Sequence, residues 1–324
     1  MYIEYFLNKQ TLVDPMRRES VVVKMEKNTT SLHKKNQRST GIAAAVFLAP
    51  VLFILIVFIA YPIIDSIKTS FYSWNGISAD KIFIGFDNWK DLLHDSIFWS
   101  AFKNNMLIVI LSICIQLPIG MALATFLDIG GKKYNLFKVI FFVPMLMSSV
   151  AIGYLFKYAL DANTGILATI STWFGGNGFD MLGNPDLAIF AIIFVICWQF
   201  IPFYMIYFLA AYSGLPVDVY EAAMIDGASR NQYFWRIVLP MMRPSIVSAI
   251  TLSMIGSLKY FDLIYVMTGG GPGNATELMA TYMYKNSFVT FKMGYGSTVA
   301  IAMFFLITIF SLAVIRLLNQ KERV

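Results

Sequence analysis

Long apolar runs alternate with short polar segments along most of the chain. The first run, residues 42–64, contains no charged residue over 23 positions. At about 1.5 Å per residue, a helix of this length crosses a hydrocarbon core of about 30 Å. Runs of the same kind predict six transmembrane helices, at about residues 42–64, 104–127, 139–156, 187–212, 244–267 and 295–315.

The first four predicted helices each carry an internal proline. Because proline lacks a backbone N–H, it leaves a carbonyl oxygen unpaired and permits a kink. These prolines are Pro50, Pro118, Pro144 and Pro202. The pattern therefore predicts an all-α membrane protein in which these helices can kink. The alternative is that prolines are simply commoner in membrane helices than in soluble ones.

Residues 1–40 differ from the rest of the chain. They are polar and rich in Lys and Arg, and they lack the apolar core of a signal peptide. We interpret them as a disordered cytoplasmic N-terminal arm, and residues 41–324 as one transmembrane domain.

Composition and charge placement support this organisation. The chain is 58% hydrophobic and 14% charged, whereas soluble domains are about 45–50% apolar. Of its 25 Lys and Arg residues, 17 lie in the N-terminal arm, the 128–138 and 213–243 loops and the C-terminal tail, and 7 lie in the other three loops. Since cytoplasmic loops retain positive charge, we expect both termini and the 213–243 loop to face the cytoplasm. The excess of Lys and Arg behind the net charge of +6 is therefore explained by membrane topology and does not indicate nucleic-acid binding.

The polar loop between the fourth and fifth predicted spans has the pattern of two short helices. Val217, Tyr220 and Met224 recur at helical spacing, and Gly227 follows as a residue that enters the left-handed conformation without a Cβ penalty. Ser229 then begins an S-x-x-Q capping box that signals a second helix. We expect this second helix to stop just before Pro240.

This loop resembles the EAA loop in the membrane subunits of bacterial binding-protein-dependent ABC importers. The match is an EAA triplet, a Gly four positions after it, and an Ile-x-Leu-Pro ending, with an Asp before the Gly as in many sugar importers. The matching residues are Glu221, Ala222, Ala223, Asp226, Gly227, Ile237, Leu239 and Pro240. An amphipathic helix pair lying on the membrane surface without a partner is the alternative. A DNA-binding helix-turn-helix is excluded, because the flanking spans prevent entry into a groove.

Two further segments extend the resemblance to most of the chain. FDLIYVMTGGGP, residues 261–272, is similar to a segment of sugar permeases in the maltose and glycerol-phosphate importer group. The F-x-G-x-D-N stretch from Phe83 to Asn88 is similar to one that this family carries outside the membrane.

The resemblance implies a type I ABC importer permease in the bacterial cytoplasmic (inner) membrane. It implies four partners besides membrane lipid: a second homologous permease forming a heterodimer, two ATPase subunits and an extracytoplasmic solute-binding protein. The EAA loop would dock on the ATPase, and the transported solute would be a sugar or oligosaccharide. Any ATP and Mg²⁺ would be bound by the ATPase subunits, with no cofactor on this chain.

The sequence itself indicates a transport subunit and not an enzyme. No stretch matches the phosphate-binding P-loop, and the glycine run at residues 268–273 opens no capped helix, so we interpret it as a flexible exit from the fifth span. His33 and His94 are the only histidines, which leaves little basis for a metal site.

Aromatic and polar residues in the fourth and fifth spans are candidates for the substrate path. Sugars need ring faces for stacking and partners for their hydroxyls. The candidates are Trp198, Gln199, Tyr204, Tyr207, Tyr260, Asp262 and Tyr265. An aromatic belt at the membrane interface is the alternative for each of them. Lys259 could pair with Asp262 three residues later.

Other transport functions remain open at this stage. A permease of this family could carry a non-sugar solute such as glycerol phosphate. An ion-coupled secondary transporter should show internal repeats and buried ionisable residues, and a membrane enzyme should show clustered acidic or His residues at the end of a span. Neither the pattern of a secondary transporter nor that of a membrane enzyme is clear in the chain.

Overall fold

The computed structural model describes residues 45–176 and 180–319, so the predicted N-terminal arm lies outside the described residues. The chain divides into two units between Asp65 and Ser66, and each is described by itself. The first apolar run is helical from Ala45 and includes a π-helical turn, η1 (Ile56–Ala60). Helix α3 (Tyr61–Thr69) then continues into the second unit.

The second unit consists mainly of helices. Two short strands, β1 (Tyr72–Ser73) and β2 (Ile82–Phe83), pair antiparallel near its start. The helices that follow are α4 (Asp87–His94), α5 (Ser96–Gly130), η2 (Gly131–Tyr134), α6 (Asn135–Leu146), α7 (Ser149–Ala159), α8 (Ile166–Trp173), α9 (Pro185–Ser213), α10 (Val217–Ile225), α11 (Arg230–Tyr233), η3 (Phe234–Val238), α12 (Leu239–Met241), α13 (Arg243–Leu258), α14 (Asp262–Met267), α15 (Met279–Tyr284), η4 (Lys285–Val289) and α16 (Met293–Asn319).

Five helical segments of the described chain are long and apolar enough to cross a membrane. They are Ala45–Thr69, Ser96–Gly130, Pro185–Ser213, Arg243–Met267 and Met293–Leu318. Helices α6 and α7 pass the same test as a pair, which makes a sixth segment if they are counted as one broken span. The predicted all-α membrane fold is therefore confirmed.

The third predicted span is broken, however. Helices α6 and α7 meet at 90°, and Met147 and Ser148 between them have extended backbone angles. Pro144 lies two residues before the end of α6, where its missing N–H weakens the last turn. Helix α7 packs against α14, which itself follows a break in the fifth span at residues 259–261.

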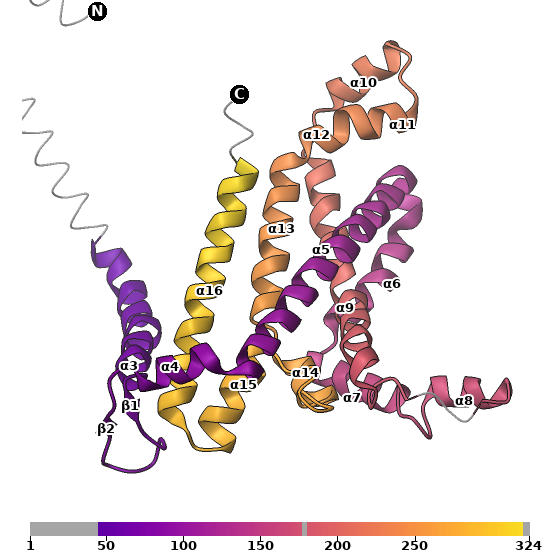
Figure 1. Ribbon diagram of the computed structural model, residues 1–324. Helices are drawn as coiled ribbons and strands as arrows, with labels where there is room; N and C mark the ends of the chain where they lie inside the picture. The colour runs from indigo at the N-terminus through magenta and orange to yellow at the C-terminus, as the bar shows by residue number, and fades with distance from the viewer. Residues whose placement is uncertain (1–44, 177–179, 320–324) are drawn as a thin grey trace, which may run out of the picture. The chain divides into compact units, whose positions relative to one another are not determined.

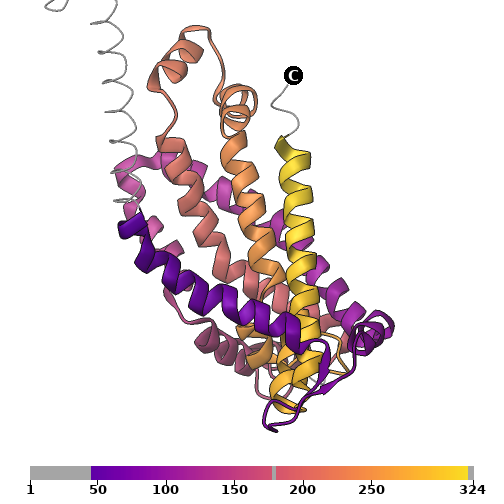
Figure 2. The ribbon, with the colours of Figure 1, turned by 90° about the vertical axis from the view of Figure 1, so that its left-hand side faces the viewer.

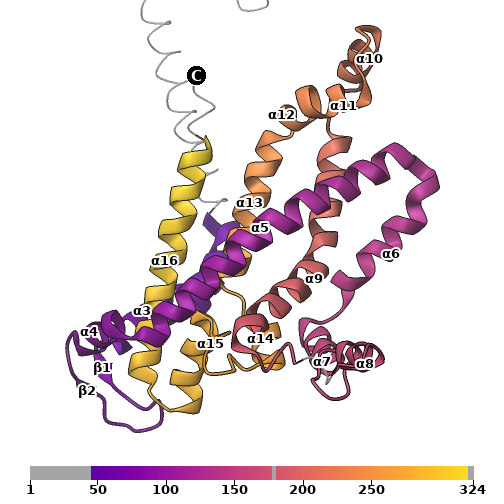
Figure 3. The ribbon, with the colours of Figure 1, turned by 45° about the vertical axis from the view of Figure 1, so that its right-hand side comes forward.

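Helices α5 and α9 lie against each other over much of their length, and α6 packs on α9. Helix α13 packs on α5 and α16. Figure 1 and Figure 3 show α10, α11 and α12 at one end of these helices, together with the α5–α6 turn and the last residues of α16. The strands, α7, α8, α14 and α15 lie at the opposite end, and Figure 2 shows the same separation from the side. The loops predicted to be cytoplasmic therefore share one end of this unit.

Candidate functional site

The EAA segment, residues 221–240, turns sharply at Gly227. This glycine has a φ of +76°, which confirms the predicted left-handed position. The Gly227 N–H donates to the Met224 carbonyl at 3.1 Å, and the Ala228 N–H donates to the Ala223 carbonyl at 3.0 Å. These two bonds form a Schellman motif that fixes the end of α10.

The second helix of the segment starts with the predicted capping box. The Gln232 N–H donates to Ser229 Oγ at 3.3 Å, and the Ser229 N–H donates to Gln232 Oε1 at 2.8 Å. The expectation that this helix stops before Pro240 is wrong. After the π-helical turn η3, Pro240 lies in the first turn of α12, where a missing N–H costs no helical hydrogen bond.

One face of the EAA segment is anchored and the other is exposed. Ala223 and Val238 are buried, and Val238 packs in an apolar cluster with residues of α5 and α9. Ile237 and Leu239 are half-buried, whereas Glu221, Ala222, Asp226 and Pro240 are exposed. Two large apolar side chains, Ile225 (85% exposed) and Trp235 (60% exposed), project from the same region. The segment is thus a helix pair joined by a tight turn, and it presents a partly apolar surface.

The pairing of the two helices is also fixed by side chains. The rings of Tyr220 from α10 and Tyr233 from α11 meet edge to face, with centroids 5.2 Å apart. Burial raises the pKa of the Tyr233 phenol, so it stays neutral at physiological pH. A displacement of one short helix would therefore be transmitted to the other.

A cavity of about 210 Å³ lies among the membrane-spanning helices. Two of the predicted path residues, Tyr204 and Tyr260, line it. The other lining residues come from α5, α6, α9 and α13, and are Gln116, Met145, Ile196, Phe200, Phe203, Leu252, Ser253, Gly256 and Ser257. We refer to this space as the membrane cavity.

Gln199, a third predicted path residue, supports the wall of this cavity. Its side chain is only 4% exposed. Gln199 Nε2 donates to Ser149 Oγ at 3.1 Å, and the Tyr260 hydroxyl donates to Gln199 Oε1 at 3.3 Å. Gln199 therefore joins the start of α7 to Tyr260 and orients the Tyr260 ring.

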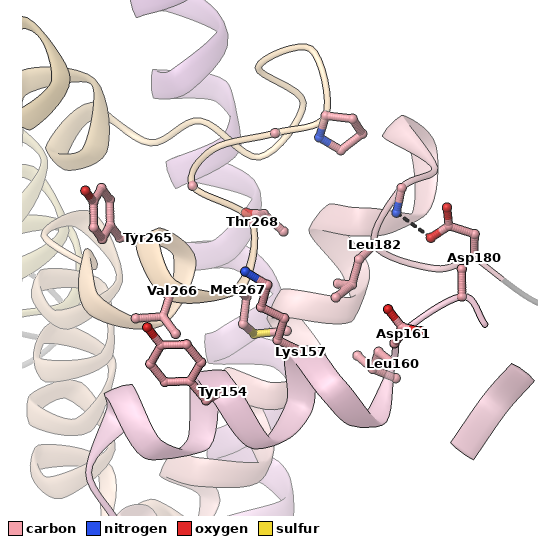
Figure 4. Close-up of a pocket in the computed structure, with 15 residues that line it drawn as sticks. Tyr154, Lys157, Leu160, Asp161, Asp180, Leu182, Tyr265, Val266, Met267 and Thr268 are labelled. Atoms are coloured by element: carbon pink, nitrogen blue, oxygen red, sulfur yellow. Dashed lines mark hydrogen bonds between the residues drawn. The ribbon is translucent and has the colours of Figure 1, made fainter. Parts of the chain in front are cut away.

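A larger pocket, about 750 Å³, lies between α7, α14 and the glycine run that follows α14. We refer to it as the α7–α14 pocket. Figure 4 shows Tyr154 and Lys157 of α7 beside Val266 and Met267 of α14, with Asp161 and Asp180 farther along the pocket. It also contains the predicted path residue Tyr265, so the candidate path residues do not gather in a single space.

The acidic side chains of the α7–α14 pocket are held by local hydrogen bonds. The backbone N–H groups of Thr164 and Asn163 donate to Asp161 Oδ1 and hold the pKa of that carboxyl below its usual range. Asp180 Oδ1 accepts from the Gly183 N–H, as drawn in Figure 4. Lys157 makes no ion pair with either carboxylate, since the ion pairs among the described residues lie elsewhere. These charges are therefore free to meet a polar ligand.

The remaining predicted path residues lie outside both spaces. Trp198 packs against Phe156, with ring centroids 5.3 Å apart, and Tyr207 stacks on Phe203. Asp262 is exposed in the first turn of α14, and it forms no ion pair with Lys259. The suggested Lys259–Asp262 pair is therefore not seen.

The structure adds residues that the sequence analysis missed. Gln116 of α5 and Ser253 and Ser257 of α13 are buried polar side chains on the cavity wall. The sequence could have identified them. Gln116 is an amide within an uncharged span, and Ser253 and Ser257 lie four residues apart and so share one face of a helix.

Apolar spans, an exposed helix pair and a small cavity within the spans together define a multi-pass membrane transport subunit. Residues 116–324 match the family described as the binding-protein-dependent transport system inner membrane component, and the chain belongs to this family.

Curated relatives cover much of the chain. A putative ABC transporter permease, ORF1 of Caldicellulosiruptor sp., is 63% identical over 139 residues, which are 43% of this chain and 99% of the relative. The sulfoquinovosyl glycerol transport system permease SmoG of Agrobacterium fabrum is 31% identical over 86% of this chain and 91% of its own. The multiple sugar-binding transport system permease MsmF of Streptococcus mutans is 32% identical over 85% of this chain and 95% of its own.

A solved structure has the same fold. A chain from a bacterial ABC transporter involved in the import of the acidic polysaccharide alginate matches with a TM-score of 0.75, covering 90% of this chain and 98% of that one. Its sequence is 24% identical, so this similarity concerns the fold alone.

Proposed function

We propose that this chain is the permease subunit of an ATP-driven importer that carries a neutral sugar or oligosaccharide across the bacterial cytoplasmic membrane. Family membership supports the importer assignment, and the names of MsmF and SmoG support a carbohydrate solute. The partners are a second permease, two ATPase subunits that bind ATP and Mg²⁺, and an extracytoplasmic solute-binding protein.

The observation that carries this proposal is the exposed surface of the EAA segment. A helix pair locked at Gly227 and packed through Val238 onto the cluster of α5 and α9 residues transmits movement, whereas a flexible loop would absorb it. Exposed Ile225 and Trp235 provide apolar area for a partner, and Glu221 and Asp226 provide charge beside it. Docking of an ATPase on this surface would couple ATP-driven closure to the membrane helices.

The orientation follows from charge and from the common end of the loops. Arg230, Arg236 and Arg316 belong to segments at the end of the unit that carries the EAA segment. By the positive-inside rule, this charge supports a cytoplasmic position for that end. The α7–α14 pocket then faces the extracytoplasmic side, from which the binding protein delivers the solute.

The chemistry of the membrane cavity favours a neutral sugar over glycerol phosphate. Tyr260 and Phe200 offer ring faces in a lining that is mainly apolar, and Gln116, Ser253 and Ser257 are its few polar side chains besides the tyrosines. Among the described residues that line the cavity none is Lys, Arg or His, the side chains that bind phosphate strongly.

Purification and reconstitution test the proposal. The tagged chain should copurify with an ATPase and a second permease. In proteoliposomes with ATP on the ATPase side and binding protein on the other, it should take up a neutral saccharide and not glycerol phosphate. Uptake driven by an ion gradient without ATP would identify a secondary transporter, and uptake of glycerol phosphate would overturn the sugar assignment.

A further inference from the structure

A second polar pocket, separate from the membrane cavity and the α7–α14 pocket, lies at the end of the unit opposite the EAA segment. It encloses about 530 Å³ between β1, α4, α15 and the start of α16. Its lining residues are Ser73, Trp74, Asn75, Asn88, Asp91, Asp95, Tyr282, Asn286, Phe291, Lys292 and Tyr295. We refer to it as the Asp95 pocket.

Asp95 is the fixed centre of this pocket. Its Oδ1 atom accepts from the backbone N–H groups of Ile97 and Phe98 at the start of α5, and its Oδ2 atom accepts from the hydroxyls of Tyr282 and Tyr295. Burial raises the pKa of the Asp95 carboxyl, but these hydrogen bonds outweigh burial and lower it overall. The two phenols therefore act as donors to Asp95. The Tyr282 oxygen also interacts with the Asn286 amide and the Tyr295 hydroxyl, so Tyr295 is the phenol with a lone pair left to accept a hydrogen bond.

Two buried amides add further acceptors. Asn88 Nδ2 donates to the carbonyls of Ser70 at 2.9 Å and Tyr72 at 3.1 Å, and Asn286 Nδ2 donates to the Tyr282 carbonyl at 2.9 Å. Neither Oδ1 atom accepts a hydrogen bond from the described residues. Asn88 belongs to the F-x-G-x-D-N stretch, so that stretch both ties the β1 segment to α4 and supplies an oxygen to the pocket.

The pocket also has free charges and ring faces. Asp91 and Lys292 are exposed and make no ion pair within the described part of the chain. Trp74 has the Lys81 ammonium over its ring at 3.8 Å. Phe291 is half-exposed at the rim. The lining is therefore rich in acceptors, with one ammonium donor and with aromatic rings.

We propose that the Asp95 pocket is a second saccharide site, located at the end of the spanning helices opposite the EAA segment and used by the same class of solute. The choice of ligand rests on the proposed function. A sugar presents several hydroxyl donors to such acceptors and packs its C–H faces on aromatic rings. The volume lies within the range of about 300–1,000 Å³ that is usual for small-molecule sites. A metal ion is disfavoured, because no group of three His, Cys, Asp or Glu side chains gathers among the described residues.

Protection of a cysteine from labelling tests the site without depending on transport. In the assembled complex, Cys114 and Cys197 are replaced by Ser and Ala, and one cysteine is introduced at Ser73, on the pocket wall. Ser78, which is exposed on the connection that follows β1 and lies outside the lining, is the matched control position. A membrane-impermeant maleimide is applied with increasing maltotriose, xylotriose or raffinose, in the absence of the binding protein.

A saccharide that binds should slow labelling of S73C and leave S78C unchanged. Asp91→Ala should raise the saccharide concentration needed for half protection by about 5- to 150-fold, because a hydrogen-bonding charge is lost. Asp87→Ala removes a carboxylate from the same helix that pairs with exposed Lys90 outside the pocket, and it should leave protection unchanged.

Other outcomes separate this proposal from the proposed function. Saccharide uptake in proteoliposomes without protection of S73C would overturn the second site and leave the function intact. Protection of S73C by ligand-free binding protein, with none by saccharide, would identify a protein-docking pocket instead. Protection by a saccharide that the complex fails to transport would support the site while counting against the sugar-import function.

Discussion

Gly120 of α5 lies directly against Tyr204 of α9. A Cβ atom placed on Gly120 would come within 2.7 Å of the Tyr204 Cβ and 3.1 Å of the Met205 backbone nitrogen. Tyr204 is buried and lines the membrane cavity. The absence of a side chain at Gly120 therefore sets both the closeness of the two helices and the position of one cavity wall.

Gly120→Val should separate α5 from α9 and destabilise the complex by about 1–3 kcal/mol, the usual cost of overpacking. Thermal unfolding of the purified complex in detergent measures this loss. Gly256→Ala is the matched control, because Gly256 is also a glycine within a spanning helix but a Cβ there meets nothing within 4 Å. Equal thermal stability of G120V and the wild type would show that the helices adjust without cost.

The sequence predicts those parts of the fold that depend on local pattern. The apolar runs mark the spans, and Gly227 and the Ser229–Gln232 box mark the ends of the EAA helices because these signals act within a few residues. The 90° break between α6 and α7 was not predicted, since Pro144 indicates only that a kink is permitted. Its direction depends on the packing of α7 against α14, residues more than a hundred positions later.

The candidate site was predicted less completely, for a similar reason. Residue type selects Tyr204, Gln199 and Tyr260 as polar aromatic or amide groups in a span, but Trp198 and Tyr207 have the same character and pack in the apolar core. Which side of a helix faces the cavity depends on how α5, α9 and α13 pack against one another. That arrangement follows from long-range contacts such as Gly120 on Tyr204, which no local pattern encodes.

Gly227→Val should uncouple the ATPase from the permease. The Cβ of Val meets no neighbour within 4 Å, so the effect comes from the positive φ alone, at a cost of about 1–3 kcal/mol for a β-branched residue. We expect normal membrane insertion, loss of saccharide uptake and reduced copurification of the ATPase. Gly227→Asn is the control, because Asn tolerates the left-handed region and should retain most activity. Wild-type uptake by G227V would show that the turn is not needed for coupling.

Lys285→Met should strongly destabilise the end of the second unit that lies opposite the EAA segment. Glu277 is fully buried, and its Oε2 atom pairs with Lys285 Nζ, while its Oε1 atom has no hydrogen-bond partner. Removing Lys285 leaves a buried charge uncompensated, which costs about 3–5 kcal/mol. The double variant Glu277→Gln/Lys285→Met should recover part of this loss. Thermal unfolding of the two single variants and of the double variant checks the prediction. A double variant that loses as much stability as the two single variants together would contradict it.

Gln199→Leu should impair transport while leaving the coupling machinery intact. The substitution removes the hydrogen bonds to Ser149 and Tyr260, so the Tyr260 ring loses its support at the cavity wall. We expect uptake to fall by about 5- to 150-fold, while ATPase activity remains stimulated by the binding protein. Trp198→Phe, which changes the adjacent residue on the side packed against Phe156, should transport normally. If W198F lost uptake and Q199L kept it, the substrate path would lie on the other face of α9.

Single cysteines should report opposite sides of the membrane at the two ends of the second unit. Ser78 is exposed on the β1–β2 connection, and Asn231 is exposed at the start of α11 in the EAA segment. These elements lie at opposite ends of the spanning helices in Figure 1. In spheroplasts, an impermeant maleimide should label S78C at once and N231C only after lysis, because the proposed orientation puts the Arg-rich end in the cytoplasm. The control is N231C after lysis, which must label fully to establish that the thiol is accessible. Labelling of N231C in intact spheroplasts would reverse the orientation and remove the EAA segment from reach of a cytoplasmic ATPase.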